Sequence, residues 1–423
     1  MRAFDHKRRH LKIVGEAMIT KISVSDRRFP LKDGAGGDSI HTDPVYAYAV
    51  CELHSASKST GIGLAFTLGR GNELVCGAIE ALAQPLIGRD IESIMSDFCK
   101  TFRAIADDQH FRWLGPHKGV VHLALAAISN ACFDLWAKQR GVPLWKLLLD
   151  LSPESLVSTL DLSNLEDVLS VDEARALINA ELPHRSSRMG VLETGYPGYD
   201  TSVGWFSYDD ETIKSNARRA VEQGFDAMKL KVGSRDVERD IRRAHLIRET
   251  VGAEARIMLD VNQQWSLPTA LMMCRKLEAM RPYWVEEPLH PDDIQGHQTL
   301  ARAIYPIQVA LGEHVANRVQ FKNFMQAGAA AFIQVDCTRV GGVSEFLTVC
   351  LLARKFGLKV VPHVGDMGQI HQHLVLVNHI ALGLEKIFLE YIPHLREYFV
   401  NPAKVQAGVY QTPQEPGSSS DLV

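Results

Sequence analysis

The strongest constraint in this sequence is a series of short apolar segments, beginning at residue 227, that each end in an ionisable residue. Amphipathic stretches with helical spacing separate these segments. The closing residues follow one another at intervals of 23 to 29 positions: Lys231, Asp260, Glu286, Glu313, Asp336, His363 and Glu390. One strand-helix unit of a (β/α)8 barrel takes about 30 residues, so one charge falls in each unit.

Apolar strands that alternate with amphipathic helices are typical of a parallel sheet. A further strand near residues 196–205 brings the expected number to eight. We therefore predict an α/β fold in which residues 161–395 form a (β/α)8-type (modified TIM) barrel. The carboxyl ends of barrel strands meet at one mouth, where active sites lie. A single strand-end charge is typically a solvated residue, but seven in register predict a functional site.

The first 160 residues follow a different pattern. Residues 18–68 alternate apolar and polar side chains around a long loop at 30–44, which predicts antiparallel strands, and residues 72–150 have helical spacing. We predict an α+β N-terminal capping domain over residues 18–160, completed by a C-terminal segment, 396–423, that returns to it. The Pro-, Gly- and Ser-rich residues from 411 onward are expected to be loosely attached.

Composition excludes several classes of partner. The formal net charge of -4 offers no basic surplus for a nucleic acid. The seven cysteines form no CxxC pair, which favours reduced thiols in the cytoplasm over disulfides or a zinc site. The most apolar stretch, 120–137, contains His122 and Asp134 and predicts a buried helix, so no membrane is expected. Residues 1–17 are predicted to be a flexible extension, in which Asp5 and Glu16 disfavour a transit peptide.

Three successive strand ends carry the carboxylates Asp260, Glu286 and Glu313. Carboxylates that converge without a cation raise one another's pKa steeply, so a divalent cation is expected among them. Ligation by oxygen alone selects Mg²⁺ over zinc or copper. Alternation along the strand predicts that the adjacent Glu287 points away from the metal.

Lys229 and Lys231 lie two positions apart on one predicted strand and should share a face. Two neighbouring ammonium groups are expected to lower each other's pKa. A lysine perturbed in this way can act as a base near neutral pH.

Asp336 and His363 end adjacent predicted strands. A carboxylate beside an imidazole fixes its tautomer and favours its protonated form, which gives a general acid or base. A zinc site formed by His363, His371 and His373 is a competing hypothesis. We disfavour it because the loop has no nearby cysteine and the three carboxylates already supply a metal site.

Several local motifs point to a known family. They include Arg28-Phe-Pro, His41-Thr-Asp-Pro, the Lys-x-Lys at 229–231, Asp260-Val-Asn-Gln-Gln-Trp, Glu286-Glu-Pro and Glu390-Tyr-Ile-Pro-His-Leu. On these motifs the chain resembles the enolase superfamily, mandelate racemase subgroup, and within it the acid-sugar dehydratases of the L-fuconate dehydratase type. The resemblance covers nearly the whole chain after Met18. Enolase-type sites with a lysine or histidine base and Mg²⁺ are a known pattern.

The resemblance implies a role for each residue of the predicted site. In that family pattern the residues would act as follows: Asp260, Glu286 and Glu313 bind Mg²⁺; Lys231 removes the proton alpha to the substrate carboxylate; His363, oriented by Asp336, protonates the departing hydroxyl; Lys229 holds the carboxylate; and Glu390 supports the anion formed. The resemblance also implies a symmetric homo-oligomer.

The implied reaction is the Mg²⁺-dependent dehydration of an L-fuconate-type aldonate to a 2-keto-3-deoxy acid, by a hydro-lyase. L-lyxonate and L-galactonate are alternative substrates. Racemisation or epimerisation of a hydroxy acid stays open as a reaction, and so does non-catalytic binding of a sugar acid. One departure from the family leaves the sugar open: the stretch from Val364 to His373 stands where fuconate dehydratases carry Gly-Gly and then a Leu-Cys-Glu type sequence.

Overall fold

The eight predicted barrel strands form one parallel sheet in the computed structural model, which describes residues 17–31 and 34–423. Their hydrogen-bonded order is β10-β9-β8-β7-β6-β5-β4, and β11 pairs with the other side of β4. The strands are β4 (Tyr196–Gly204), β5 (Ala227–Lys231), β6 (Arg256–Asp260), β7 (Trp284–Glu286), β8 (Gln308–Leu311), β9 (Phe332–Ile333), β10 (Lys359–Val360) and β11 (Leu389–Tyr391). The predicted modified barrel is confirmed.

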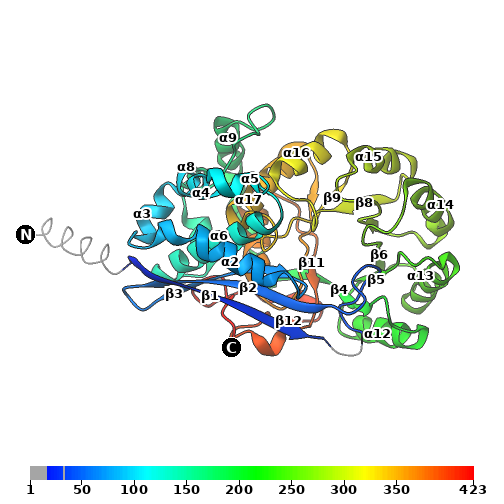
Figure 1. The fold of residues 1–423 in the computed structure, drawn as a ribbon. Helices are drawn as coiled ribbons and strands as arrows, with labels where there is room; N and C mark the ends of the chain where they lie inside the picture. Colours follow the sequence, from blue (N-terminus) through cyan, green and yellow to red (C-terminus); the bar gives the residue numbers. More distant parts are fainter. Residues whose placement is uncertain (1–16, 32–33) are drawn as a thin grey trace, which may run out of the picture.

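Helices on the outside connect the strands, as Figure 1 shows for the green-to-orange part of the chain. They are α12 (Asp210–Glu222), α13 (Val237–Val251), α14 (Leu267–Leu277), with the short η3 (Glu278–Met280), α15 (Ile294–Ala303), α16 (Arg318–Ala327), α17 (Gly342–Phe356) and α18 (Ile370–Ile380). Side chains at the N-caps of five of them accept hydrogen bonds from first-turn backbone N–H groups, which fixes where these helices begin: Asp209, Asp236, Ser266, Asp293 and Asn317. These caps set the lengths of the loops that leave the strands.

The strand register places the predicted charges side by side. Lys231 lies opposite Asp260, and Asp260 lies opposite Glu286, at the carboxyl ends of β5, β6 and β7. Large side chains, including those of Tyr199, Trp284 and Phe332, fill the barrel interior below this level. The charges therefore lie above a packed apolar floor, and small molecules reach them only from the carboxyl ends.

Three later strands are shorter than the sequence suggests. The ladder of β8 ends at Leu311, that of β9 at Ile333 and that of β10 at Val360. Glu313, Asp336 and His363 therefore follow their strands instead of ending them. The chain stays aligned through single bonds such as Gln334 N–H to the Leu311 carbonyl (2.8 Å).

An antiparallel sheet and a group of helices form the predicted capping domain. The sheet has the order β1 (Ile19–Pro30), β2 (Val45–Ser55), β3 (Thr60–Thr67). The helical elements are α2 (Asn72–Leu82), η1 (Gln84–Leu86), α3 (Ile91–Ser96), α4 (Phe98–Ala106), α5 (Gln109–Trp113), α6 (Gly119–Gln139), α7 (Leu144–Asp150) and α8 (Pro153–Ser158). Four short elements lead on to the barrel: α9 (Val171–Glu181), η2 (Leu182–His184), α10 (Arg185–Arg188) and α11 (Val191–Thr194).

The helix α6 is the core of the cap. By length and composition it could cross a membrane, but 89% of its most apolar window is buried inside the protein. The prediction of a buried helix is confirmed. Its backbone touches β3, because a Cβ at Gly63 would lie 1.8 Å from the Ala127 carbonyl oxygen. Only glycine allows this approach.

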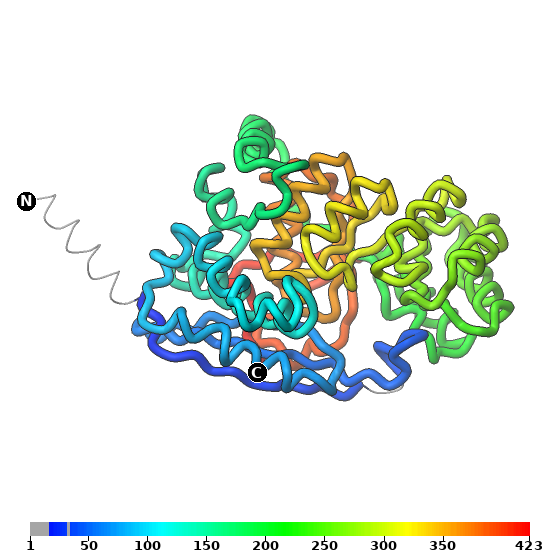
Figure 2. The backbone as a smooth tube through the Cα atoms, turned by 45° about the horizontal axis from the view of Figure 1, so that its top comes forward, coloured from blue at the N-terminus to red at the C-terminus, as the bar shows by residue number. Residues whose placement is uncertain are grey.

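The cap reaches across to the barrel. The loop between β1 and β2 contacts the chain beyond β4 and β6, through the Gly37 carbonyl to Phe206 N–H (3.1 Å) and Ser39 Oγ to the Val261 carbonyl (3.0 Å). In Figure 2 this blue loop runs from the cap to the green part of the barrel. The loop therefore lies over the carboxyl ends of the strands.

The C-terminal segment is firmly attached, so the expectation of a loose tail is wrong. After η4 (Arg396–Tyr398), β12 (Val405–Gln406) and β13 (Val409–Tyr410), the chain packs against the cap, and Ser418, Ser419 and Ser420 are buried. Small polar residues are typical of flexible tails, but here their hydroxyls and N–H groups meet a buried acceptor. The boundaries at residues 160 and 395 stay predictions, and the expected extension 1–17 lies outside the described residues except for Ala17.

Asp134 of α6 is that acceptor. Its carboxylate accepts hydrogen bonds from Ser418 N–H (2.6 Å), Ser418 Oγ (2.8 Å) and Ile62 N–H (2.7 Å). It also pairs with Lys138 (2.8 Å), which in turn binds Asp421. One carboxylate thus joins the cap helix, the cap sheet and the C-terminal segment.

We expect Asp134→Ala to lower the free energy of unfolding by about 3 kcal/mol, because it removes one ion-pair partner of Lys138 and leaves the Ile62 and Ser418 N–H groups without their acceptor. Urea denaturation and limited proteolysis of the C-terminal segment measure the change. Asp150→Ala is the control: Asp150 forms an exposed pair with Lys146 on α7, and its loss should change little. Equal stability of the two variants would contradict the role given to Asp134.

Candidate active site

The three predicted metal ligands converge. Asp260 and Glu286 end neighbouring strands and are almost wholly buried, and Glu313 follows β8 by two residues. One carboxylate oxygen from each lies within 4.8 Å of the other two. Oxygen ligands of an octahedral Mg²⁺, each about 2.1 Å from the ion, are about 3–4 Å apart, so small shifts suffice for a shared cation. The donor set fits magnesium.

Neighbouring groups orient these carboxylates. The indole N–H of Trp284 donates to Glu286 Oε2 (2.9 Å), and Asn262 N–H donates to Asp260 Oδ1 (3.1 Å). Burial, together with the charge of Asp260, raises the pKa of Glu286 to about 8. A carboxyl group in this state gains most from a cation placed between it and its neighbour.

The two lysines share a face of β5, as predicted, and both enter the carboxylate cluster. Lys229 Nζ lies 2.7 Å from Glu286 Oε1 and 2.7 Å from Glu390 Oε1. Lys231 Nζ lies 2.5 Å from Asp260 Oδ2 and 3.2 Å from Asn262 Oδ1. The structure therefore brings five of the predicted site residues into direct contact.

Lys229 does lower the pKa of Lys231, as predicted, but the expected net lowering of that pKa is wrong. Burial lowers the pKa of Lys231, and so does Lys229, but the carboxylates of Asp260, Asp38 and Glu313 together raise it above its usual range. Burial likewise opposes the charge of Lys229, while Glu286 and Glu390 raise its pKa. The sequence showed two ammonium groups side by side, but not the closer carboxylates around them.

Asp336 and His363 form the predicted pair. His363 Nδ1 lies 2.7 Å from Asp336 Oδ2, and His363 Nε2 lies 3.3 Å from Glu313 Oε2. Burial opposes the imidazolium, but Glu313 and Asp336 raise the pKa of His363 to about 9. One ring nitrogen is thus held by Asp336, and the other faces the metal ligands.

Glu390 is the middle residue of β11 and lies beside Lys229 of β5. Its Oε1 accepts a hydrogen bond from Thr201 Oγ1 (2.5 Å) as well as the contact from Lys229, and its Oε2 accepts one from Val364 N–H (3.1 Å). These bonds link the first and last strands of the barrel to the loop that carries His363.

The histidines of the competing zinc hypothesis do not converge. His373 Nδ1 accepts a hydrogen bond from Trp145 N–H of the cap (3.1 Å), whereas His371 Nε2 lies 2.9 Å from Asp336 Oδ1. The expectation that no cysteine lies nearby is wrong, since Cys337 Sγ lies 3.3 Å from His371 Nε2. Burial raises the pKa of that thiol well above its usual range, so it is protonated when no metal is bound.

Glu287 lies outside the group of three converging carboxylates, and its side chain has partners that strand alternation does not predict. Its backbone is left-handed (φ 41°), because the strand has ended at Glu286. The side chain is buried and bonds with His314 (3.0 Å) and Gln263 (2.9 Å). His314 also contacts Glu313 (3.2 Å), so Glu287 supports the metal ligands indirectly.

A pocket opens between this cluster and the cap. Its lining includes Lys231 and His363 from the barrel, and Asp38, His41 and Tyr46 from the cap. Asp38 accepts hydrogen bonds from the backbone N–H and the imidazole of His41 (2.6 and 2.8 Å). The resemblance implies that the loop from Arg28 to Pro44 caps the mouth and reads the distal hydroxyls of the substrate, and the structure places Asp38 and His41 of this loop in the pocket lining.

Family comparisons agree with this geometry. Residues 25–148 match the N-terminal domain of the mandelate racemase / muconate lactonizing enzyme family, and residues 212–422 match the enolase C-terminal domain-like family. The chain is 42% identical to mitochondrial enolase superfamily member 1 from Homo sapiens, over 96% of this chain and 93% of that protein. The crystal structure of the human protein superposes with a TM-score of 0.94 at 41% identity, covering 96% of this chain and 94% of that one.

Two further relatives are named as dehydratases. L-galactonate dehydratase from Hypocrea jecorina is 38% identical, over 97% of this chain and 93% of that protein. L-talarate/galactarate dehydratase from Salmonella typhimurium, in a crystal structure with Mg and L-lyxarohydroxamate, has a TM-score of 0.77 at 26% identity, covering 96% of this chain and 90% of that one.

These relatives confirm the predicted enzyme class, a hydro-lyase, and Mg²⁺ as its cofactor. The capped barrel, the convergent carboxylates and the two matching family models agree with one another. The chain belongs to the enolase superfamily, in its mandelate racemase / muconate lactonizing enzyme branch.

Proposed function

We propose that this protein dehydrates an aldonate of the L-fuconate type to a 2-keto-3-deoxy acid. The observation that carries the proposal is the pairing of Lys231 and His363 in one pocket, each held by a carboxylate, on either side of the proposed metal ligands. A base and an acid are both needed to remove a proton and a hydroxyl group from adjacent carbons.

Asp260, Glu286 and Glu313 hold Mg²⁺ in this proposal. When bound, the ion supplies positive charge that stabilises the negative charge developing on the substrate carboxylate. Asp260, which helps to raise the pKa of Lys231, would then be shared between the ion and the ammonium group. Lys231 is thereby released towards its neutral form.

Lys231 Nζ then takes the proton from C2 of the aldonate, and the electron pair moves into the carboxylate. His363 Nε2 gives its proton to the C3 hydroxyl, which leaves as water while the electron pair forms the C2–C3 double bond. The resulting enol takes up a proton at C3, loses the proton of its C2 hydroxyl and becomes the 2-keto-3-deoxy acid. Asp336 keeps the proton of His363 Nδ1 in place throughout, so the other nitrogen faces the substrate.

Lys229 and Glu390 bind and orient in this scheme. Lys229 lies beside Asp260 (3.3 Å) and Glu286, where the substrate carboxylate would meet the metal ligands. Its positive charge attracts that carboxylate. Glu390, fixed by Thr201 and Val364 N–H, holds Lys229 and would share a hydrogen bond with the deprotonated substrate.

L-galactonate is the substrate named for a relative with 38% identity, and it fits the same proposal. L-fuconate and L-galactonate have the same configuration at C2 to C5 and differ only at C6, where L-fuconate lacks the hydroxyl. L-lyxonate is the shorter candidate. Both six-carbon acids therefore present the same C2 proton and C3 hydroxyl to Lys231 and His363.

Racemisation of a hydroxy acid is the second candidate, because two opposed proton-transfer groups serve that reaction as well. The named dehydratases among the relatives favour elimination. We further propose that the protein is cytoplasmic and forms a symmetric homo-oligomer.

The proposed substrate class is tested by incubating the protein with a panel of aldonates and aldarates and trapping 2-keto products with semicarbazide, with and without Mg²⁺. We expect product from L-fuconate or L-galactonate, and none after EDTA treatment. Inversion at C2 without a 2-keto product would establish racemisation instead. Ligand-induced melting shifts without either product would establish a non-catalytic binder.

The proposed metal ligands predict a Mg²⁺-dependent melting temperature. At 100 times its Kd, an ion that binds only the folded protein adds about 2.7 kcal/mol to the free energy of unfolding. We expect this rise in wild type, measured by thermal melting and titration calorimetry, and its loss in Glu313→Gln. Asp226→Asn is the control, since Asp226 lies just before β5 at the opposite end of the barrel. Unchanged Mg²⁺ binding by Glu313→Gln would remove Glu313 from the site.

The proposed acid and base predict two inactive variants that still bind metal. Lys231→Ala and His363→Asn should each lower kcat by roughly 10²–10⁴-fold, because each removes a proton-transfer group, while Mg²⁺ still stabilises the protein. Steady-state kinetics on the acid sugar that yields a 2-keto product measure the loss. Lys359→Ala, at the start of β10, is a matched control that should keep full activity. Wild-type turnover in either site variant would refute its assigned role.

A further inference from the structure

His371 occupies a position that the proposed mechanism does not use. It lies in the first turn of α18, is almost wholly buried, and its Nε2 is 2.9 Å from Asp336 Oδ1. The carboxylate of Asp336 thus stands between two imidazoles, since His363 Nδ1 contacts its other oxygen at 2.7 Å. His371 belongs to the segment in which this chain departs from fuconate dehydratases.

The remaining contacts of Asp336 come from its own loop. Thr338 donates to Asp336 Oδ1 through its N–H and its hydroxyl, both at 2.7 Å. These bonds are local and move with the loop, whereas His371 comes from a helix. His371 is therefore the contact that ties the carboxylate to the rigid outer layer of the barrel.

The tautomer of His371 follows from its surroundings. Its Nε2 lies 2.9 Å from Asp336 Oδ1 and 3.1 Å from the backbone nitrogen of Cys337, whose N–H points at it, so Nε2 can either donate to the carboxylate or accept from this N–H. If Nε2 carried no hydrogen, its lone pair would face a carboxylate oxygen at hydrogen-bond distance, which is repulsive. A hydrogen bond to a charged acceptor is roughly twice as strong as one between neutral groups, so Nε2–H donates to Asp336.

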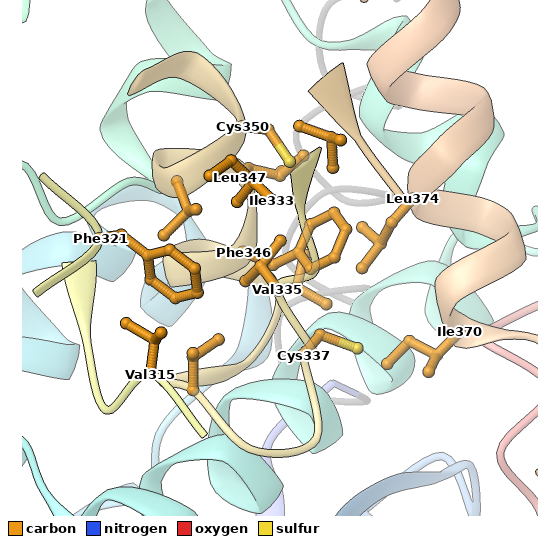
Figure 3. Close-up of a cluster of buried hydrophobic side chains, with 14 of the residues drawn as sticks. Val315, Phe321, Ile333, Val335, Cys337, Phe346, Leu347, Cys350, Ile370 and Leu374 are labelled. Atoms are coloured by element: carbon orange, nitrogen blue, oxygen red, sulfur yellow. The ribbon is translucent and has the colours of Figure 1, made fainter. Parts of the chain in front are cut away.

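The helix that carries His371 is held firmly. Figure 3 shows Ile370 and Leu374 of α18 packed in an apolar cluster with Cys337 and Phe346. The ring of His371 also lies edge-on to Phe346, with ring centroids 6.2 Å apart. The imidazole is thus fixed on both sides, as a group that positions another side chain must be.

We propose that His371 is a positioning residue for the acid half of the reaction. By donating to Asp336 Oδ1 it holds the carboxylate in the rotamer in which Oδ2 meets His363 Nδ1, and so directs His363 Nε2 into the pocket. This inference rests on the proposed function. The inference predicts that loss of His371 slows the departure of water. The rate of removal of the C2 proton, which depends on Lys231, should stay nearly unchanged.

The two half-reactions can be measured separately in D2O. Deprotonation and return exchange the C2 proton of the substrate for deuterium, and elimination yields the 2-keto acid. We expect His371→Leu, with Mg²⁺ bound, to lower elimination roughly 10–100-fold, as is typical for partners that orient a functional group, and to leave C2 exchange within about threefold. KM should change little, because His371 does not touch the pocket lining.

Two conservative variants, His371→Gln and His371→Asn, test the proposal even if His371→Leu is unstable. The amide nitrogen of Gln reaches the place of histidine Nε2, whereas that of Asn reaches only the place of Nδ1. His371→Gln should therefore recover elimination and His371→Asn should not. Equal activity of these two variants would overturn the proposal.

His373→Leu is the matched control, since His373 lies on the same helix, is also buried and bonds with the cap through Trp145 N–H. It should lower exchange and elimination together, if at all. A parallel loss of both steps in His371→Leu would show a merely structural role and overturn the inference. Failure of wild type to form a 2-keto acid would instead overturn the proposed function, and the two outcomes are distinct.

Discussion

The contact of Lys229 with three buried carboxylates is the interaction on which the rest of the site depends. One ammonium group lies within 3.3 Å of Asp260, Glu286 and Glu390, which come from β6, β7 and β11. A buried ion costs several kcal/mol unless it is well paired, and none of these four groups could be buried alone. The barrel brings the four groups together, and the positive charge of Lys229 offsets the repulsion among the three carboxylates.

The positive charges of the cluster do not balance its negative charges, so a cation is expected there. Lys229 and Lys231 face the carboxylates Asp260, Glu286, Glu313 and Glu390, and burial together with Asp260 raises the pKa of Glu286 to about 8. Protonation of a glutamate is one way to relieve the excess charge. A divalent ion is the other, and it leaves the oxygens free to act as ligands.

The features that depend on the periodicity of strands and helices could be predicted from the sequence. The positions of residues in loops and in the C-terminal segment could not. The barrel, the cap and the side-by-side placement of Lys231, Asp260 and Glu286 follow from strand register, which alternation encodes. Alternation stops with the strand, so it gave no partners for Glu287, whose backbone is left-handed. Burial of Ser418 against Asp134 was equally invisible, because a Ser-rich tail is polar in isolation and is satisfied only by a partner 284 residues away.

The two halves of the site are therefore built by different means. The proposed metal ligands lie on or just beyond three paired strands, β6, β7 and β8. The ladder hydrogen bonds of these strands fix Asp260 and Glu286 directly. The proposed acid, His363, and its partner Asp336 lie on loops beyond β10 and β9. Side chains fix these loops: His371 contacts Asp336, and Asn130 of the cap donates to the Cys337 carbonyl (2.9 Å). Loops accept sequence changes more readily than paired strands. In the proposed reaction, sequence changes in these loops should therefore alter the departure of water more readily than the removal of the C2 proton.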